Sequence, residues 1–469
     1  MAEPILSPDG KWMWTGSEWI PAPPSSSQST KILLQDSVVG GDINITQNNA
    51  EDIATAMVQA LERMGFSGQS SPAELTPSQE AEVEQVLEMS EQLAGHGIEI
   101  DPWTEITLGN AAKLAGRTHS AQQNYFRALE TFRKNGDRQG ESSSLLGLGM
   151  IAEIRGDLAE ADRLIRESVA IDRETGNRHS EAISLQNLGK IAHIRGDLAE
   201  TERLQHESLG IYKEVGDRKG EAASLNNLAI IASSRGNPAE AERLQQESLA
   251  IKREIGDQLG AAISLQNLGE IARHIGDLAE AERLQQESLG IYKEIGHRRG
   301  EGKSLQNLGV IRYLQGDYTR AERLYRESLA ILREIGDRNG EADSLRNLGN
   351  IAETRDDREE AERLYRESLA IYKEIGNRKG EATSLNCLGA ILPSIENNLD
   401  GAERLIREGL AIQREIGDRD GEATSLYYLG HIMFAKGQID EERRMHTESV
   451  RIRREIGTPI SQWHIDNGY

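Results

Sequence analysis

A single phrase recurs along most of this chain with almost no change in length. Its core reads S-L-x-N-L-G-x-I-A-x-x-x-G-D-x-x-E-A-E-R-L-x-x-E-S-L, and E-I-G-D-R-x-G-E-A follows shortly after. Leucines 40 residues apart mark the copies: Leu145, Leu185, Leu225, Leu265, Leu305, Leu345, Leu385 and, after one inserted residue, Leu426. Such constant spacing is typical of a stacked array rather than of one globular domain. Because a stacked array offers a long continuous surface, the pattern favours binding to other chains over catalysis.

Each copy is predicted to form two helices, as residues 181–220 illustrate. Apolar residues of the first helix lie close to the 3.6-residue period: Leu185, Leu188, Ile191 and Ala192. The second helix has a similar stripe, formed by Leu204, Ser208, Ile211 and Val215. Gly196 is expected to end the first helix, because glycine adopts the left-handed conformation without a Cβ clash. Asp197 is expected to cap the second helix, with Glu200 completing a capping box.

The pattern resembles the tetratricopeptide repeat. The landmarks of that family appear in this copy as Leu185, Leu188-Gly189, Thr201, Leu204 and Ser208. The unit is about six residues longer than the usual one, and in this it resembles the Pins/LGN spindle adaptors and, more distantly, kinesin light chains. A degenerate first copy is visible at Leu108-Gly109, so the resemblance covers residues 105–457. It implies an all-α, right-handed superhelix (an α-solenoid) of about nine repeats, whose first helices line a concave groove.

The segment before the array is predicted to contain a small β-hairpin module at residues 1–21. Trp12 and Trp14 lie on one face of an expected strand, between turn signals at Pro8-Asp9-Gly10 and Thr15-Gly16-Ser17. The module could fold by packing on its own tryptophans or on the array. Alternatively, its aromatic surface could bind a proline-containing or extended peptide. The third alternative is that the segment is disordered. Residues 22–30 form a Pro/Ser linker.

Residues 31–66 are predicted to form short strands followed by an amphipathic helix. The helix has one apolar stripe, made of Ile53, Met57, Leu61 and Met64. Because two short strands and one helix are not stable alone, self-association as a homo-oligomer through residues 31–66 is a hypothesis. Residues 67–77 are a second linker, and residues 78–104 are an acidic helix that leads into the array.

Composition narrows the classes of function. The net charge of −23 argues against nucleic acid as a partner, since nucleic-acid binding needs a basic patch. No apolar run is long enough to span a membrane, the first residues do not resemble a signal peptide, and the lone Cys387 suits a reducing compartment, so a cytoplasmic protein is expected. Motifs for catalysis, phosphate binding and metal binding do not occur. We therefore expect no enzymatic activity, no cofactor and no metal.

Comparison of the copies separates constant columns from variable ones. The variable columns of the first helix begin at Ile183, Gln186, Lys190 and His193, which form one stripe. By resemblance this stripe faces the groove, and a nearly constant asparagine lies beside it. We expect these residues to bind a peptide: Asn187, Asn227, Asn267, Asn307, Asn347, Gln186, Lys190, His193, Arg273, Tyr313, Arg346 and Asn350.

The asparagines are predicted to form a ladder. A primary amide both donates and accepts hydrogen bonds, so a row of amides can hold an extended backbone without reading its sequence. The alternative is that asparagine is only the packing residue that the repeat prefers. The function we expect is a non-enzymatic scaffold or adaptor whose partner is a protein or peptide; the alternative is a sensor whose array changes shape when a peptide binds.

Two departures from the repeat carry further predictions. Pro393 is expected to end or kink the first helix of the eighth copy, with the inserted residue in a longer connection. Residues 458–469 form a C-terminal cap or tail. Within them, Trp463 is expected to dock on the final helix and cover Ile452 and Ile456.

Overall fold

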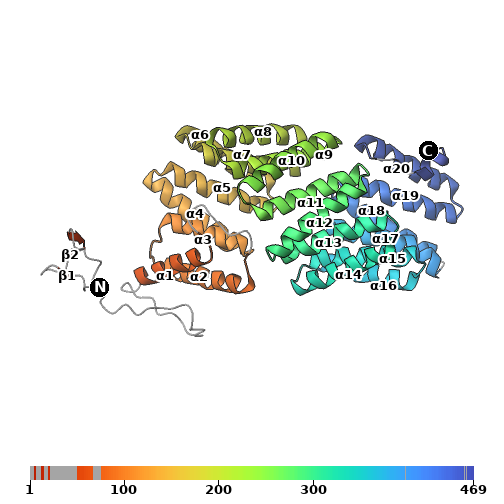
Figure 1. Cartoon of the computed structure of the whole chain (residues 1–469), viewed down its shortest axis with the longest axis horizontal. Helices are drawn as coiled ribbons and strands as arrows, with labels where there is room; N and C mark the ends of the chain where they lie inside the picture. The colour runs from red at the N-terminus through yellow and green to blue at the C-terminus, as the bar shows by residue number, and fades with distance from the viewer. Residues whose placement is uncertain are drawn as a thin grey trace. The chain divides into compact units, whose positions relative to one another are not determined.

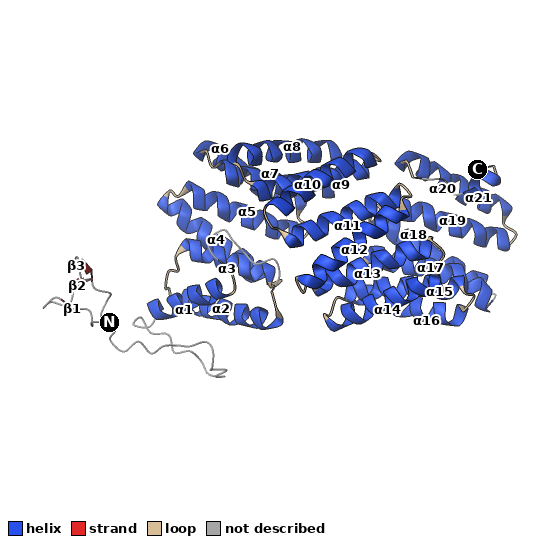
Figure 2. Ribbon diagram, in the orientation of Figure 1, coloured by secondary structure: helices blue, strands red, loops and turns tan. Residues whose placement is uncertain are grey.

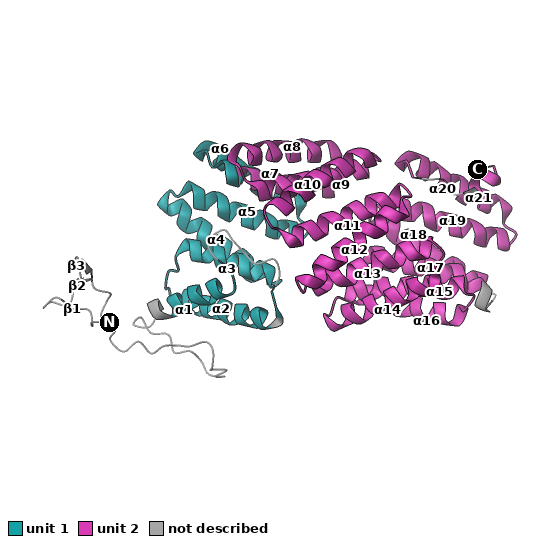
Figure 3. Ribbon diagram, in the orientation of Figure 1, with its two compact units in different colours: residues 1–180 teal, residues 181–469 magenta. Residues whose placement is uncertain are grey.

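The computed structural model is almost entirely helical over the residues it describes (Figure 2). These are residues 5–6, 12–14, 19–21, 50–66, 75–396, 398–458, 460 and 462–468. The chain divides into two compact units, Met1–Ser180 and Glu181–Tyr469 (Figure 3).

Three short strands are described near the start of unit 1. They are β1 (Ile5–Leu6), β2 (Trp12–Trp14) and β3 (Trp19–Pro21), and they pair antiparallel in the order β1-β2-β3. The side chains of residues 1–21 lie outside the description, so the tryptophan-rich module stays a prediction. The strands expected between residues 31 and 49 lie outside the described residues altogether.

Two helices precede the repeats in unit 1, and they pack on each other. These are α1 (Ala50–Arg63) and α2 (Pro77–Gly95), the latter begun by a complete capping box at Thr76. The apolar stripe of α1 is buried in one core with α2 and the first repeats. The stripe is therefore covered within the chain and cannot be the surface for the predicted self-association. That hypothesis now rests on residues 31–49 alone.

The described helices form nine pairs, each made of a first and a second helix (Figure 1). Unit 1 holds two pairs: α3 (Pro102–Leu114) with α4 (Thr118–Asn135), and α5 (Arg138–Ile154) with α6 (Leu158–Thr175). The degenerate first copy is thus a helix pair like the others.

Unit 2 continues the pattern through seven pairs. Their bounds are α7 (Arg178–Ile194), α8 (Leu198–Val215), α9 (Arg218–Ser234), α10 (Pro238–Glu254), α11 (Gln258–His274), α12 (Leu278–Glu294), α13 (Arg298–Leu314), α14 (Tyr318–Glu334), α15 (Arg338–Thr354), α16 (Arg358–Glu374), α17 (Arg378–Glu396), α18 (Leu399–Glu415), α19 (Arg419–Ala435) and α20 (Ile439–Ile456). A short helix, α21 (Gln462–Asp466), follows.

The helix ends follow the glycine and aspartate pattern. Gly196 has φ 78° and ends the turn after α7, as predicted. The Asp197 carboxylate accepts the main-chain N–H of Glu200 at 3.0 Å and caps α8, also as predicted. The Glu200 carboxylate pairs with Arg203 at 2.7 Å, which gives it a partner on its own helix. In the seventh pair Asp356 takes the place of glycine and adopts φ 63°, a conformation that glycine adopts at less cost.

Each pair is held together by small residues at its centre. In most pairs a fully buried serine of the second helix donates its hydroxyl to a main-chain carbonyl of the first: Ser208 to Ala182 at 2.9 Å, Ser248 to Ala222 at 2.8 Å and Ser288 to Ala262 at 2.9 Å. The glycine of the Leu-Gly landmark faces a larger side chain. A Cβ on Gly189 would lie 2.5 Å from Nε2 of Gln205, so only glycine allows this approach.

The prediction that the helix ends near Pro393 is wrong, whereas the alternative, a kink in the helix, stays a prediction. The helix α17 continues through Pro393 to Glu396, and the next helix is already capped by Asn398. The inserted residue therefore lengthens the helix instead of the connection. Ile391 and Leu392 are buried in the repeat core. Their packing outweighs the hydrogen bond that proline removes so close to the helix end.

Trp463 does dock on the final helix pair. Its ring centroid lies 4.4 Å from that of His446 on α20 and 4.5 Å from that of His431 on α19. The following His464 is fully buried, and its Nε2 lies 3.2 Å from Nδ1 of His446. Ile452 is buried in the repeat core, but Ile456 remains 37% exposed. The segment thus covers the histidine face of the pair, and the expectation that it covers Ile456 is wrong.

We predict that low pH weakens this docking. Burial, together with the neighbouring His431 and His464, lowers the pKa of His446 to about 3. The Glu442 carboxylate lies 3.9 Å from Nε2 of His446. Burial and the positive charge of Arg453 oppose protonation of His464 and lower its pKa. Because the folded pKa lies below the ordinary value of 6.5, the undocked state binds more protons, and stability is lost as pH falls from 6.5 toward 3. Removing residues 458–469 should therefore lower Tm more at pH 7.5 than at pH 5. An equal loss at both values would contradict the prediction.

Candidate functional site

A cavity in unit 2 is lined by several of the residues that the sequence predicts to bind a peptide. It has a volume of about 380 Å³, and its wall includes Gln186, Asn187, Lys190, His193 and Asn227. Lys190 and His193 are exposed, whereas the three amides are half-buried. Positions i, i+4 and i+7 of α7 therefore do lie on one face, as the 3.6-residue period dictates. The neighbouring α9 contributes Asn227 and Ile230.

The asparagines use part of their hydrogen-bonding capacity inside the array. Asn187 Nδ2 donates to the carbonyl of Ile183 at 2.8 Å, one turn back on its own helix. The next three reach a neighbouring repeat: Asn227 donates to Gln205 Oε1 at 3.2 Å, Asn267 to Asn226 Oδ1 at 2.9 Å, and Asn307 to Gln285 Oε1 at 3.4 Å. These contacts favour a structural contribution. Peptide binding by the ladder stays a proposal.

The variable column that begins at Gln186 is largely structural. Gln186 Nε2 donates to Ser224 Oγ of the next repeat at 2.9 Å, and its Oε1 accepts from the Tyr212 hydroxyl at 3.1 Å. Two repeats later, Gln266 makes the same two contacts, with Ser304 at 2.9 Å and Tyr292 at 3.0 Å. The Nε2 end of each amide thus reaches the next repeat, and the Oε1 end binds a tyrosine of its own repeat. These contacts favour a structural contribution from Gln186, and its contact with a peptide stays a proposal.

Arg346 occupies the same column but cannot accept a hydrogen bond. The chain compensates with Asp343, one helical turn earlier. Its Oδ1 accepts from the Tyr372 hydroxyl at 2.7 Å and from Arg346 Nη2 at 3.0 Å. The arginine is therefore held by an ion pair with Asp343, and Asp343 preserves the tyrosine contact that glutamine makes in other repeats.

The remaining predicted residues lie farther along unit 2 and are partly engaged. Arg273 pairs with Glu270 on its own helix at 2.8 Å. The Tyr313 hydroxyl lies 3.1 Å from Thr354 Oγ1, and Asn350 Oδ1 accepts from the Tyr365 hydroxyl at 2.7 Å. Asn347 is half-buried on α15. None of these residues lines the cavity beside Lys190, which therefore gathers only the start of the predicted stripe.

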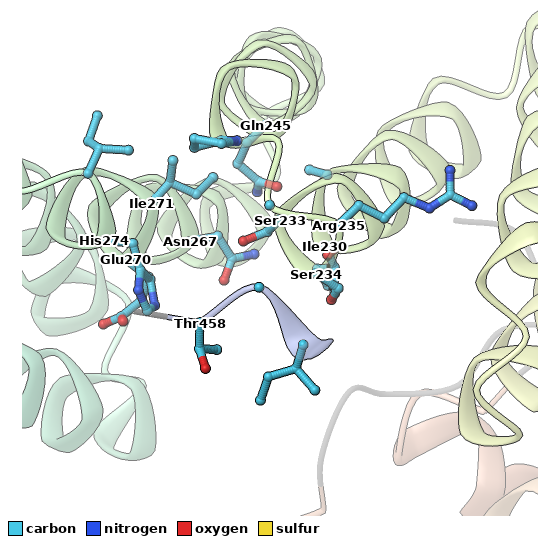
Figure 4. Close-up of a pocket in the computed structure, with 16 residues that line it drawn as sticks. Ile230, Ser233, Ser234, Arg235, Gln245, Asn267, Glu270, Ile271, His274 and Thr458 are labelled. Carbon is cyan, nitrogen blue, oxygen red and sulfur yellow. Dashed lines mark hydrogen bonds between the residues drawn. The ribbon is translucent and has the colours of Figure 1, made fainter. Parts of the chain in front are cut away.

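A second cavity, of about 610 Å³, was not predicted from the sequence (Figure 4). Its walls come from α9, α10 and α11 and from the chain directly after α20, where Gly457 and Thr458 lie. Asn267 is the only residue of the predicted set among those that line it. Ile230, Ser233 and Glu270 also line it and belong to the variable columns that begin at Lys190 and His193. Sequence comparison missed Thr458, which lies outside the repeats, and Gln245, which belongs to a second helix.

Charged side chains on the second helices pair along their own helix. Arg203 lies 2.7 Å from Glu200 and 3.0 Å from Glu207, and all three are partly exposed. In the next repeat the hydrogen bond from Arg243 holds the pKa of Glu240 below its ordinary value. Exposed pairs of this kind contribute little to stability. This agrees with their interpretation as solvated faces rather than as catalytic acids.

Other kinds of site have no support in the described part of the chain. No group of three or more His, Cys, Asp or Glu side chains is placed there to hold a metal ion. Among the described helices none is both long and apolar enough to cross a lipid bilayer. Cys387 is half-buried, and burial raises the pKa of its thiol to about 11, which leaves the sulfur protonated at neutral pH.

The tetratricopeptide repeat family model matches residues 140–214, 180–254, 220–294, 259–334, 300–374 and 380–455. The chain belongs to the tetratricopeptide repeat family. The matched residues make up most of the sequence, and the helix pairs of the structure follow the same period.

Two solved structures share this fold at low sequence identity. A signal-transduction ATPase with a tetratricopeptide repeat sensor from Pyrococcus horikoshii is 15% identical, with a TM-score of 0.50 over 87% of this chain and 73% of that one. Aspartyl phosphate phosphatase F from Bacillus subtilis is 10% identical, with a TM-score of 0.50 over 90% and 99%. A putative kinesin light chain from Podosopora anserina is 19% identical, with a TM-score of 0.36 over 41% and 95%. No curated protein sequence matches the chain.

We predict that the asparagine contacts contribute modestly to stability. Replacing Asn227 with Ala should lower the free energy of unfolding by about 1 kcal/mol, the usual net contribution of one hydrogen bond. Leu228→Ala, in the adjacent buried position, should cost about 2–5 kcal/mol. Denaturant unfolding of the two variants measures both. Equal losses would show that the asparagine is a core residue and is not available to a ligand.

Proposed function

We propose that this tetratricopeptide repeat protein is a scaffold that binds an extended peptide or a segment of a partner protein along the first helices of its array. The observation that carries the proposal is the cavity of about 380 Å³ beside α7 and α9. It combines exposed charged and polar side chains, Lys190 and His193, with half-buried amides and an apolar floor.

The chemistry of this surface suits a peptide better than a small metabolite. Polar groups are spread along one helix face instead of converging on one point. A surface of that kind can hold several residues of an extended chain through separate contacts. The residues at the variable positions of the first helix differ from repeat to repeat. Each repeat can therefore select a different residue of the bound partner.

A sensor is the second candidate function. The cavity of about 610 Å³ is lined by α9 and α11 and also by the residues after α20. A ligand bound there would contact two parts of the array that are far apart in sequence, and would favour the arrangement in which both are in place. The array of the Pyrococcus ATPase is described as a sensor, and in this chain the same role remains a proposal.

We predict that Lys190 and His193 contribute to peptide affinity. The double change Lys190→Glu and His193→Ala should weaken binding of labelled, capped heptapeptide pools about fivefold or more, as for residues at the centre of an interface. Fluorescence polarisation with the full chain measures the affinity.

Lys219→Glu is the matched control, because Lys219 is an exposed lysine that does not line the cavity. It should bind the pools as the unchanged protein does. If both variants bind equally well, or if no pool binds the unchanged protein, the proposed function is wrong.

A further inference from the structure

The fourth repeat, formed by α9 and α10, differs from its neighbours at three linked buried columns. The repeats on either side carry glutamine, glycine and tyrosine: Gln186, Gly189 and Tyr212, then Gln266, Gly269 and Tyr292. The fourth repeat carries Asn226, Ala229 and Lys252 instead. Each change alters a hydrogen bond that the other repeats make.

The asparagine and the lysine change the link to the next repeat. In the third repeat the glutamine side chain reaches the next serine, from Gln186 to Ser224 at 2.9 Å. Asn226 is one methylene shorter, and Lys252 Nζ donates to the equivalent serine, Ser264, at 2.9 Å. Asn226 Oδ1 is then free to accept from Asn267 at 2.9 Å and from Gln245 Nε2 at 3.0 Å.

The alanine changes the environment of the glutamine on the second helix. In the third repeat Gln205 lies directly against Gly189 and donates to the main-chain carbonyl of Gln186 at 3.2 Å. Ala229 carries the Cβ that Gly189 lacks, so the amide of Gln245 cannot take the corresponding position. Its Oε1 is left buried, with no hydrogen-bond partner among the described residues.

The same cavity holds a second such atom. Oγ1 of Thr458 is also buried without a hydrogen-bond partner in the described part of the chain. Both residues line the cavity of about 610 Å³, where the Gln245 side chain reaches from α10 toward Asn267 and Ser233 (Figure 4). Buried polar atoms left unpaired destabilise a protein, so the cavity holds two atoms whose hydrogen bonds a bound group would complete.

The charged side chains that line the cavity already have partners. Glu270 pairs with Arg273 at 2.8 Å, Arg235 pairs with Glu202, and His274 contacts Arg273. A charged ligand group would therefore be buried without a counter-charge, which is unfavourable. A neutral group with both a donor and an acceptor fits the unpaired amide oxygen and the unpaired hydroxyl.

We propose that this cavity is a subsite for a carboxamide, the side chain of an asparagine or glutamine residue in the bound peptide. Gln245 Oε1 accepts from the carboxamide N–H₂, and the Thr458 hydroxyl donates to its carbonyl. The inference rests on the proposed function, since the carboxamide arrives on a peptide that lies along the first helices.

The test uses the full chain and capped heptapeptide pools in which one position is fixed. Pools fixed as Asn or Gln should bind about tenfold more tightly than pools fixed as Asp, Glu or Leu, because the wrong group leaves the buried atoms unpaired. Gln245→Leu and Thr458→Val should each abolish this preference. Ala229→Gly should weaken it, because it gives Gln245 the position that Gln205 occupies.

Gln285→Leu is the matched control, since Gln285 holds the same column in the fifth repeat but does not line the cavity, and its amide is satisfied by Gln266 and Asn307. It should keep the carboxamide preference and lower Tm, whereas Gln245→Leu should leave Tm unchanged or raise it. Pools that bind without such a preference, or with a preference that Gln245→Leu retains, overturn the subsite but not the groove. If no pool binds, both proposals fail.

Discussion

A buried serine of the second helix sets the geometry on which most of the repeats depend, and an equally small residue, Ala128 or Gly409, takes its place in the first and eighth pairs. The serine hydroxyl reaches a main-chain carbonyl of the first helix, as Ser328 does with Gly302 at 2.8 Å and Ser368 with Ala342 at 2.9 Å. Only a small side chain allows the two helix backbones to lie this close, and the donated bond fixes their register. Because the same contact recurs from the third to the seventh pair, the first helices of these repeats present the same face. The candidate groove is a consequence of that repetition.

A second set of contacts joins one repeat to the next. Arg333 on α14 lies 2.6 Å from Glu367 on α16 in the next repeat, and the amides of Gln186 and Gln266 reach serines of the following first helix. These links help a chain with few aromatic residues to hold its repeats together, because polar bonds between repeats supplement thin apolar layers. They also explain why some side chains near the groove are less available to a ligand, since residues such as Gln186 and Gln266 form hydrogen bonds between repeats.

Much of this was predictable from periodicity. The helix pairs, the capping by Asp197 and the glycine after α7 follow from local rules that need only a few neighbouring residues. The role of Gln186 did not follow, because a column that varies between copies was interpreted as unconstrained by the fold. The structure shows that it varies in concert with other columns: Arg346 occurs with Asp343, and Asn226 with Lys252. Such paired substitutions can be found only when two positions of the repeat are compared together, and comparing one position at a time does not reveal them.

The central claim is that a peptide lies along the first helices, and hydrogen exchange tests it most directly. The full chain would be measured free and saturated with the tightest-binding heptapeptide pool, peptide by peptide, with mass spectrometry. The account predicts slower exchange in α7, α9 and α11, with the second helices α8, α10 and α12 little changed outside Gln245. Slower exchange confined to the second helices, or no change anywhere at saturation, would contradict it.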